Sequence, residues 1–498
     1  MISALIFLPA AAAIFLLFVP EEKNRFIKGF SLIFSSLPLF LGLWLLARFD
    51  PTYPLPQFAE VARWIGSGLF YHVGADGISL MLLLLTSFLS PLAVASSFNY
   101  IKERQKEYYI MLLLLQTGMA GVFAAQNLFL FYIFWEAMLI PMYFLIGIWG
   151  GERKLYATVK FVLYTMVGSL LMLVGIIYFW KTSPGHSLYF YNLYSLNIPP
   201  GTQILLFLAF ALAFAIKVPL FPFHTWLPDA HTEAPTAGSV LLAGVLLKMG
   251  GYGFLRLAMP LFPYAFRLFL PYLVVLAIVS IIYGAAMAFV QEDAKRLVAY
   301  SSVSHLGVVM LGLFLLSFKS YMGGIYQMLN HGLSTGALFL LIGMLYERTH
   351  TRDMGKLGGL AKPLPALAAF LSVTVFSSIG LPGLNGFVGE FLVFLGSFQV
   401  SKTAGAFAAL GVILSAVYLL WMYRRVMQGP VKNPAYMDLP GMSLREILIM
   451  VPIVILFFWM GIYPRFFMGK FEKSARFMME ITQQKYKIVS IVEQGGAK

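Results

Sequence analysis

The stretch FYIFWEAMLIPMYFLIGIWG, residues 131–150, decides the fold class of this protein. It is almost wholly apolar and contains a single charged residue, Glu136. About 20 apolar residues in an α-helix are enough to cross the hydrocarbon core of a bilayer. The sequence holds about fourteen such runs, so we predict an all-α polytopic membrane protein. The runs begin near residues 1, 26, 78, 109, 128, 159, 202, 238, 269, 297, 325, 365, 404 and 447.

The composition excludes other classes of protein. Of the 498 residues, 60% are hydrophobic and 11% are charged, whereas soluble domains carry roughly 25% charged residues. The apolar runs are continuous rather than alternating, which favours helices over barrel strands. Because the chain has no cysteine, we expect no thiolate metal site on it, and any redox chemistry would belong to other chains.

The positive charges indicate how the chain is oriented. Alternate loops carry 19 Lys and Arg residues and the opposite loops carry six, so the positive-inside rule places the N-terminus outside. We therefore attribute the net charge of +14 to orientation and predict no nucleic-acid partner. Fourteen spans would leave the C-terminus outside too, although the tail from Arg465 carries seven more cations. Residues 475–489 fit an amphipathic interfacial helix and, equally well, a frayed charged end.

Two of the predicted spans are interrupted in the same way. The seventh ends at Lys217 and continues into FPFHTWLPDAH, residues 221–231, and the twelfth contains LPGLNGFVGE, residues 381–390. Broken helices often mark a transport path. We predict four segments: three spans in residues 1–108, a five-helix repeat in 109–260, a second repeat in 261–425, and the last span with the tail in 426–498. An odd number of spans per repeat would invert the second copy.

A few ionisable residues lie inside the apolar runs. A charge at the bilayer centre costs roughly 2.5–3.5 kcal/mol, so such residues are by default functional. They combine carboxylate, amine and imidazole groups, each able to bind and release a proton. We predict that they form a proton relay, with a static buried Glu136–Lys217 ion pair as the alternative. The predicted relay residues are Glu136, Lys217, Lys248, His305, His331 and Glu390.

Other polar features are interpreted as structural. Arg256 stays charged, so we expect it to hold a carboxylate or to reach the interface rather than to relay protons. The loop from His224 to Glu233 contains two histidines, Asp229 and Glu233, but it lacks an HExxH pattern and Pro228 interrupts it. We therefore predict no metal site and no nucleotide-binding loop.

Three segments resemble a known family. HTWLPDAHTEAPTAG (residues 224–238), EDAKRLVAYSSVSHLG (292–307) and the 381–390 segment closely resemble antiporter-like subunits of respiratory complex I and of multisubunit Na⁺/H⁺ antiporters. The ionisable residue of the twelfth span is typically Lys in the L- and N-type subunits and Glu in the M-type. Glu390 and the modest tail, which is too short for a long lateral helix, therefore resemble the M-type group equivalent to mitochondrial subunit 4.

The resemblance implies specific roles. Glu136 and Lys217 would be a coupling pair, Lys248 the central relay, His305 and His331 its continuation and Glu390 the exit. FMN, iron–sulfur clusters and quinone would belong to partner subunits, with L- and N-type subunits as neighbours in the cell inner membrane or an equivalent energy-converting membrane. The alternatives are a subunit of a Na⁺/H⁺ antiporter, the D-type subunit of a ferredoxin-driven photosynthetic complex, and a purely structural spacer.

Overall fold

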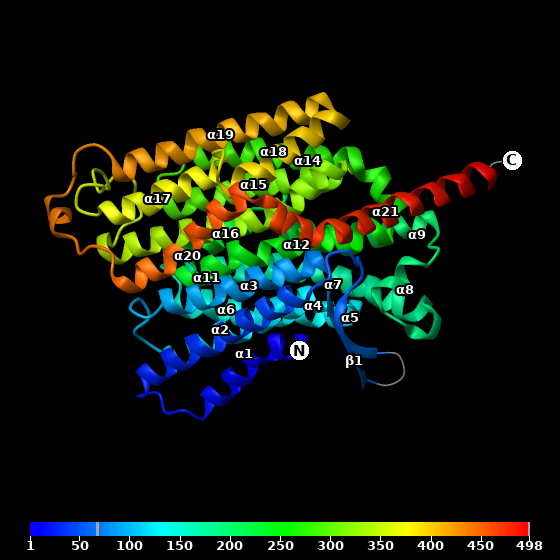
Figure 1. The fold of residues 1–498 in the computed structure, drawn as a ribbon, viewed down its shortest axis with the longest axis horizontal. Helices are drawn as coiled ribbons and strands as arrows, with labels where there is room; N and C mark the ends of the chain where they lie inside the picture. Colours follow the sequence, from blue (N-terminus) through cyan, green and yellow to red (C-terminus); the bar gives the residue numbers. More distant parts are fainter. Residues whose placement is uncertain (66–68, 497–498) are drawn as a thin grey trace.

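The computed structural model describes residues 1–65 and 69–496, and it is mainly a bundle of helices that run along one common direction (Figure 1). Within this described part, twelve helices are long and apolar enough to cross a membrane, which confirms the all-α polytopic class. They are α2 (Asn24–Arg48), α3 (Gly77–Ser96), α4 (Gln105–Ala124), α5 with α6 (Leu128–Ala137, Leu139–Trp149), α7 (Lys154–Thr182), α9 (Pro200–Lys217), α11 to α13 (Thr236–Leu261), α14 (Pro263–Phe289), α15 (Ala294–Phe314), α16 (Phe318–Thr349), α19 (Lys402–Met427) and α20 (Leu444–Ile462).

Shorter helices complete the bundle. Helices α1 (Ile2–Leu17), α17 (Pro365–Ser378) and α18 (Asn385–Val400) are apolar but shorter, so the count of fourteen spans stays a prediction. The two predicted interruptions are present: α9 is followed by the short α10 (Trp226–Glu233), and α17 is separated from α18 by residues 379–384. The predicted five-helix repeats, and the inversion of the second, also stay predictions.

A β-hairpin corrects the expectation of a wholly helical chain. Strands β1 (Gln57–Ile65) and β2 (Leu69–Ala75) pair antiparallel in the link between α2 and α3. The two strands satisfy each other's backbone N–H and C=O groups, which form no helical hydrogen bonds in this link. Glu60 in β1 accepts hydrogen bonds from the N–H groups of Ile2 (2.8 Å) and Ser3 (3.2 Å). Partial burial raises the pKa of Glu60, but hydrogen bonds from the N-terminal ammonium group and from the hydroxyl and N–H of Ser3, together with the charge of that ammonium group, outweigh it and hold the pKa below its ordinary value.

The links between helices gather at two opposite ends of the bundle. At the hairpin end, where residues 57–75 lie, the short α8 (Phe190–Tyr194) joins the loop before α5, because the N–H of Phe190 donates to the carbonyl of Gln126. At the other end, the N–H of Gly151 donates to the carbonyl of Glu233. The N-terminus and the start of the last helix share the hairpin end, which agrees with the predicted topology (Figure 1).

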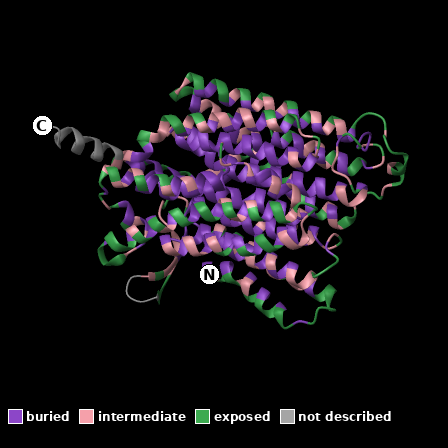
Figure 2. Cartoon of the chain, turned by 180° about the vertical axis from the view of Figure 1, so that it is seen from behind, coloured by how far each residue is buried: buried purple, intermediate pink, exposed green. Residues whose placement is uncertain are grey.

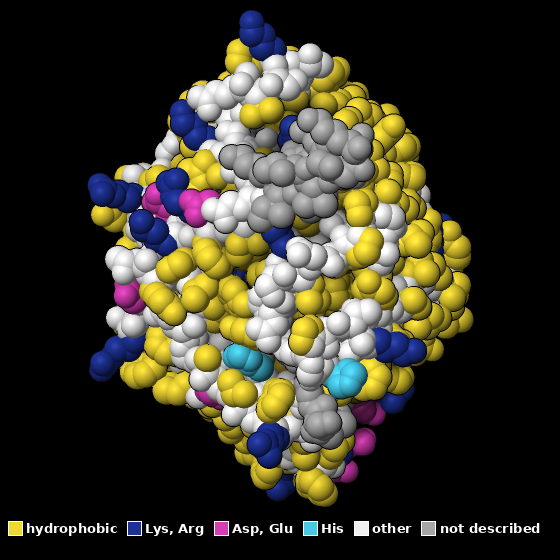
Figure 3. All heavy atoms as spheres, turned by 90° about the vertical axis from the view of Figure 1, so that its right-hand side faces the viewer, with side chains coloured by type: hydrophobic (Ala, Val, Ile, Leu, Met, Phe, Trp, Pro, Cys, Tyr) yellow, Lys and Arg dark blue, Asp and Glu magenta, His cyan; other side chains and the backbone are white. Residues whose placement is uncertain are grey.

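The C-terminal tail forms one long helix, α21 (Pro464–Gly496). One face of α21 is buried by Phe467, Phe471, Ala475 and Met478, against α3, α13, α14 and α16. The predicted helix over residues 475–489 therefore exists, in place of a frayed end, and up to residue 485 its apolar face packs on protein rather than on lipid; the side chains of 486–489 lie outside the described residues. Lys and Arg side chains are spread around this end of the molecule, with hydrophobic side chains between them (Figure 3).

Burial divides the helices into an inner group and an outer group (Figure 2). The described spans α11 to α13, α15 and α16 are completely buried over their apolar windows, whereas less than half of the window is buried in α2, α7, α14, α19 and α20. Exposed apolar side chains such as Leu155 (73% exposed) and Val174 (64%) suit contact with lipid. The inner group carries three of the six predicted relay residues, Lys248, His305 and His331.

Docking of α21 depends on one glycine at the start of α3. A Cβ on Gly77 would collide with the backbone carbonyl oxygen of Lys470. We expect Gly77→Ala to loosen α21, with a cost of about 1–3 kcal/mol, as for other overpacked contacts. Faster limited proteolysis of the tail in the detergent-purified protein would report the loosening. Gly469→Ala, on α21 itself with open space around its Cβ, is the control, and equal cleavage of both variants would contradict the prediction.

Candidate functional site

Four of the predicted relay residues lie in one buried row. Lys248 Nζ is 2.7 Å from His331 Nδ1, and His305 Nδ1 is 3.0 Å from Glu390 Oε1. The two imidazole rings lie with their centroids 5.8 Å apart. All four residues are at most 5% exposed. The row therefore crosses from the α11–α13 segment through α16 and α15 to α18, and each member is a group that can exchange a proton.

The backbone around Lys248 departs from a regular helix. Residues 242–246 and 254–258 form π-helical turns on either side of it, and such turns are frequent at functional sites. Lys248 Nζ also donates to the carbonyl oxygen of Ala243, which lies within the first π turn. A Cβ on Gly250 would come within 2.8 Å of the backbone nitrogen of Val218, directly after Lys217. Gly250 thus lets this segment approach the broken end of α9 closely.

Glu390 is held at the beginning of α18, directly after the interruption. Gln327 Nε2 donates to its Oε1 at 3.1 Å, and Asn330 Nδ2 donates to Gln327 Oε1 at 3.0 Å. Gly380 has a φ of +75°, and a Cβ there would lie 2.8 Å from Glu390 Oε2. The left-handed turn at Gly380 favours glycine and leaves room for the carboxylate. The row therefore extends past Glu390 into a buried amide pair.

Several polar partners of the row were not predicted from the sequence. Gln327 and Asn330 precede His331 on α16, and Tyr418 on α19 has its hydroxyl 3.3 Å from His305 Nε2. A signal for the first two was present, because two amides within four residues of a buried histidine stand out in an apolar run. Tyr418 had no such signal, because tyrosines are common in this chain.

Glu136 and Lys217 lie apart from the row and do not touch each other. Lys217 is 1% exposed, and its Nζ lies 5.3 Å from the ring centroid of Trp135 and 5.8 Å from that of Phe161. Among the described residues, neither Lys217 Nζ nor Glu136 Oε1 has a hydrogen-bond partner. The static ion pair considered as an alternative is therefore not formed. The two charges still interact electrostatically through the space between them.

The charged residues around the first interruption are paired with protein groups. Asp229 accepts a hydrogen bond from Lys160 at 2.7 Å, and Glu233 Oε2 accepts one from the N–H of Arg153 at 2.9 Å. His231 is stacked on Phe339, with ring centroids 4.6 Å apart. In the part of the chain that the structure describes, no three His, Cys, Asp or Glu side chains converge as metal ligands would. Asp229 and Glu233 thus anchor α10 to α7 and to the residue directly before α7.

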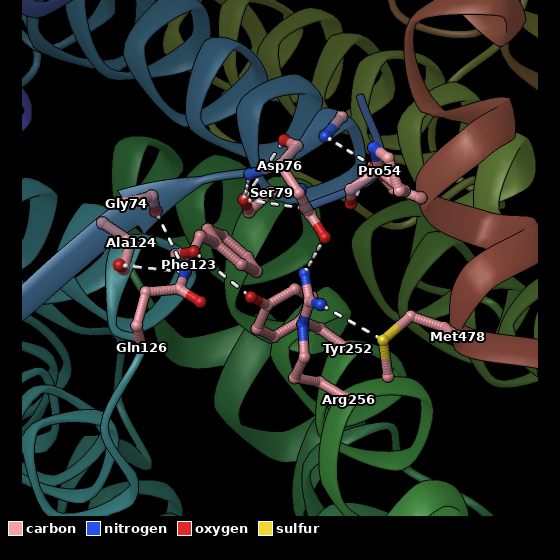
Figure 4. Close-up of polar contacts among 12 residues, drawn as sticks. Pro54, Gly74, Asp76, Ser79, Phe123, Ala124, Gln126, Tyr252, Arg256 and Met478 are labelled. Atoms are coloured by element: carbon pink, nitrogen blue, oxygen red, sulfur yellow. Dashed lines mark hydrogen bonds and ion pairs between the residues drawn. The ribbon is translucent and has the colours of Figure 1, made fainter. Parts of the chain in front are cut away.

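Arg256 holds a carboxylate, as the sequence analysis expected (Figure 4). Its guanidinium forms a buried ion pair with Asp76, the N-cap residue of α3, and its Nη1 lies 3.3 Å from Met478 Sδ on α21. Asp76 also accepts the N–H of Ser79 at 2.9 Å. The side chains of Tyr252 and Arg256 face one another, with the guanidinium carbon 5.4 Å from the ring centroid. The pair ties the segment that carries Lys248 to α3 and α21.

Breaking this pair is expected to destabilise the subunit. Arg256→Met would leave Asp76 buried without a countercharge, which costs about 3–5 kcal/mol in other proteins. The measurement is the temperature at which this subunit dissociates from the purified complex on heating. The double variant Asp76→Asn with Arg256→Met removes both charges and should recover part of the loss. A single variant as stable as the parent protein would contradict this assignment.

Comparison with known proteins assigns the chain to a family. The family model "NADH:quinone oxidoreductase/Mrp antiporter, TM" matches residues 125–416, and the model "NADH-ubiquinone oxidoreductase chain 4, amino terminus" matches residues 58–120. NADH-quinone oxidoreductase subunit M of Rhodobacter capsulatus is 45% identical over 93% of each chain. Subunit M of Rickettsia felis is 42% identical over 96% of this chain and 98% of its own. The chain belongs to the subunit M family.

Solved structures agree with this assignment. A chain of respiratory complex I from Thermus thermophilus is 33% identical to this subunit M family member, with a TM-score of 0.89 over 97% of this chain and 100% of that one. A chain of the Mrp complex from a Dietzia species has a TM-score of 0.85 at 20% identity, over 97% and 99%, which shows a shared fold alone. The predicted M-type resemblance is confirmed. The protein is a multi-pass subunit of an inner-membrane complex.

Proposed function

We propose that this chain translocates protons as one pump module of a proton-translocating NADH:quinone oxidoreductase. The observation that carries the proposal is the buried row Lys248–His331–His305–Glu390, with its two direct contacts of 2.7 and 3.0 Å. A buried amine, two imidazoles and a carboxylate in sequence are suited to pass a proton from one group to the next. The 5.8 Å between the imidazole centroids is short enough for one bridging water.

The proposed proton movement uses both nitrogens of each imidazole. Lys248 Nζ gives a proton to His331 Nδ1, and His331 releases one from Nε2, which has no partner among the described side chains. His305 takes it up and delivers a proton from Nδ1 to Glu390 Oε1. The order amine, imidazole, imidazole, carboxylate would then set the path toward α18. Moving one charge against the membrane potential costs about 2.3 kcal/mol per 100 mV, which must come from redox chemistry elsewhere.

Glu136 and Lys217 are proposed as the coupling pair that controls this row. Lys217 Nζ has no hydrogen-bond partner among the described residues, so its buried charge is balanced by the electrostatic interaction with Glu136 and by the faces of the Trp135 and Phe161 rings. A movement of either side chain would change that balance. The close approach of Gly250 to the end of α9 supports transmission to Lys248, because any shift at Lys217 would reach this segment through backbone contact.

The redox groups are proposed to lie on partner subunits. The chain contains no cysteine to ligate an iron–sulfur cluster, so FMN, the clusters and the quinone site would belong to other chains. L- and N-type antiporter-like subunits are the proposed neighbours within the membrane. For a Na⁺/H⁺ antiporter subunit, one would expect clustered oxygen ligands, whereas the row here is rich in nitrogen. A ferredoxin-driven parent complex would differ from the proposed one in its electron donor, which would be ferredoxin instead of NADH.

One purification tests the parent reaction. The protein is extracted with a mild detergent and isolated through a tag, and the absorbance and NADH oxidation of the material are recorded. Flavin and iron–sulfur absorbance with NADH-dependent quinone reduction, and acidification in reconstituted vesicles, are expected. If the co-purifying subunits have no flavin or iron–sulfur absorbance and the vesicles exchange Na⁺ for protons, the chain is instead a subunit of a Na⁺/H⁺ antiporter. Colour without NADH oxidation would point to another electron donor.

Glu136→Gln is expected to lower coupled pumping about tenfold, on the scale of about 1.4 kcal/mol for the lost charge. Glutamine keeps the shape of the side chain and an oxygen that can accept the hydrogen bond from Ser169, and Glu136 Oε1 has no partner among the described residues, so assembly should be intact. The ratio of protons moved to NADH oxidised in proteoliposomes measures the effect. Glu152→Gln, at an exposed position in the next link, is the control. Normal coupled pumping by Glu136→Gln would refute the coupling role.

A further inference from the structure

An apolar groove that no relay residue lines opens on the side of the bundle. It has a volume of about 500 Å³ and lies between α2, α3, α16 and α20, beside the first turn of α21 (Figure 1). Every residue that lines it is hydrophobic. Two of these, Leu43 and Ile455, are 48% and 57% exposed, so the groove opens toward the surrounding bilayer. A hollow of this size, lined only by carbon-rich side chains, is suited to an apolar ligand.

The groove occupies only one half of the membrane thickness. On α2 its lining runs from Leu39 to Leu46, and on α20 from Pro452 to Met460. Seven to eight residue steps along a helix cover about 10–12 Å, against about 15 Å for half of the hydrocarbon core. Both stripes lie toward the ends of their helices, where the chain reaches the hairpin end. The groove therefore lies in the leaflet at the hairpin end.

Cations are next to lining residues along the chain at the interfacial end of the groove, together with aromatic rings. Arg48 follows the lining residue Leu46 by two positions, and Arg465 directly precedes the lining residue Phe466. Lys470 Nζ lies 5.7 Å from the ring centroid of Phe466, which in turn stacks on Trp459 at 5.1 Å. Aromatic residues at this depth are typical of a membrane–water interface.

The charges of these cations are not neutralised by neighbouring acids. Among the described ion pairs none involves Arg48, Arg465 or Lys470. Asp50, two residues from Arg48, accepts hydrogen bonds from the N–H and O–H of Thr52 at 2.9 and 2.6 Å. Glu472, two residues from Lys470, pairs instead with Arg476 at 3.6 Å. The interfacial end of the groove therefore combines three available positive charges with a purely apolar interior.

We propose that the groove binds the acyl chain of an anionic phospholipid and that Arg48, Arg465 and Lys470 hold its phosphate. The apolar stripe within one leaflet and the cations at its interfacial end match the two parts of such a lipid. A transmembrane helix of a neighbouring subunit fits less well, because one helical turn about 10 Å wide already fills about 400 Å³. It would also run through both leaflets, whereas the groove is confined to one.

Photo-crosslinking in the intact parent complex tests the proposal. The probes are phosphatidylglycerol and phosphatidylcholine, each with a diazirine in the same acyl chain, and labelled peptides are mapped by mass spectrometry. We expect phosphatidylglycerol to label peptides that contain Leu43 and Ile455 more strongly than phosphatidylcholine, by about fivefold for each contributing cation. Arg48→Gln, Arg465→Gln and Lys470→Gln combined should remove this preference. Leu43→Trp combined with Ile455→Trp should lower labelling by both lipids.

A matched variant and NADH oxidation complete the experiment. Lys402→Gln removes a cation at the same end, at the start of α19, which has no lining residue, and should leave labelling unchanged. NADH oxidation shows that each variant has assembled. Equal labelling by the two lipids would overturn the proposal, because the groove would then be ordinary lipid-facing surface. A protein cross-link from Ile455 to a neighbouring subunit, without lipid labelling, would overturn it in favour of a subunit interface.

Discussion

Lys248→Met is expected to stop proton transfer through this subunit while the parent complex still assembles and reduces quinone. Lys248 is fully buried and donates to His331 Nδ1 at 2.7 Å and to the carbonyl of Ala243. Methionine has a similar length and no charge, so the segment keeps its packing while the row loses its first proton carrier. A proton would then cross the gap as an unsolvated charge, which costs about 2.5–3.5 kcal/mol and slows transfer about 70- to 400-fold.

The measurement is the ratio of protons translocated to NADH oxidised in proteoliposomes. Lys402→Met is the matched control, because this lysine lies at the beginning of α19, away from the row. If Lys248→Met translocates as many protons per NADH as the parent protein, the result would support the alternative that this chain is a purely structural spacer. Loss of NADH oxidation together with pumping would instead show that the substitution blocks the whole complex, as expected when the steps are tightly coupled.

Glu390→Gln is expected to have an effect of the same size at the other end of the row. Its Oε1 accepts from Gln327 at 3.1 Å and contacts His305 Nδ1 at 3.0 Å, and an amide oxygen can keep both contacts. Glutamine cannot take up a proton, so a proton that reaches His305 has no acceptor. The cost of passing it on as an unsupported charge is again about 2.5–3.5 kcal/mol, or about 70- to 400-fold in rate.

Aspartate provides the control at the same position. Glu390→Asp keeps a carboxylate but shortens the side chain, so it should lengthen the contact with His305 and retain part of the pumping. We expect the number of protons moved per NADH in vesicles to be highest for the parent protein with Glu390, lower for Glu390→Asp and lowest for Glu390→Gln. If Gln pumped as well as Asp, the carboxylate would have no part in proton transfer, and a purely structural role for Glu390 would follow.

Span positions and helix breaks were predictable because each depends on a local property. A run such as residues 131–150 is apolar on every side, and this alone is enough to predict a membrane helix. Proline and glycine at 219–222 and 380–383 cannot continue a regular helix, and both interruptions are present. The hairpin at residues 57–75 was missed, because a short polar link between spans does not show whether its backbone groups pair with each other or with water.

The identity of the site residues was also predictable, but not their contacts. Lys248 and His331 are 83 residues apart, and their contact depends on how α12 and α16 are rotated about their axes. Glu136 and Lys217 looked like an ion pair from their charges, yet the tertiary structure separates them, with the Trp135 and Phe161 rings near the amine. Neither rotation nor separation follows from a pattern along one helix, because packing between helices sets them.

The amino-acid sequence by itself determined that this is a multi-span helical membrane protein with interrupted spans and a small set of buried ionisable groups. Burying charge in a bilayer is so costly that these few positions stand out without any structure. Only the tertiary structure decided that four of them form one row, that Asp76 is the partner of Arg256, and that α21 packs on protein. These outcomes depend on close approach between distant segments, which glycines such as Gly77 and Gly250 permit because a side chain there would not fit.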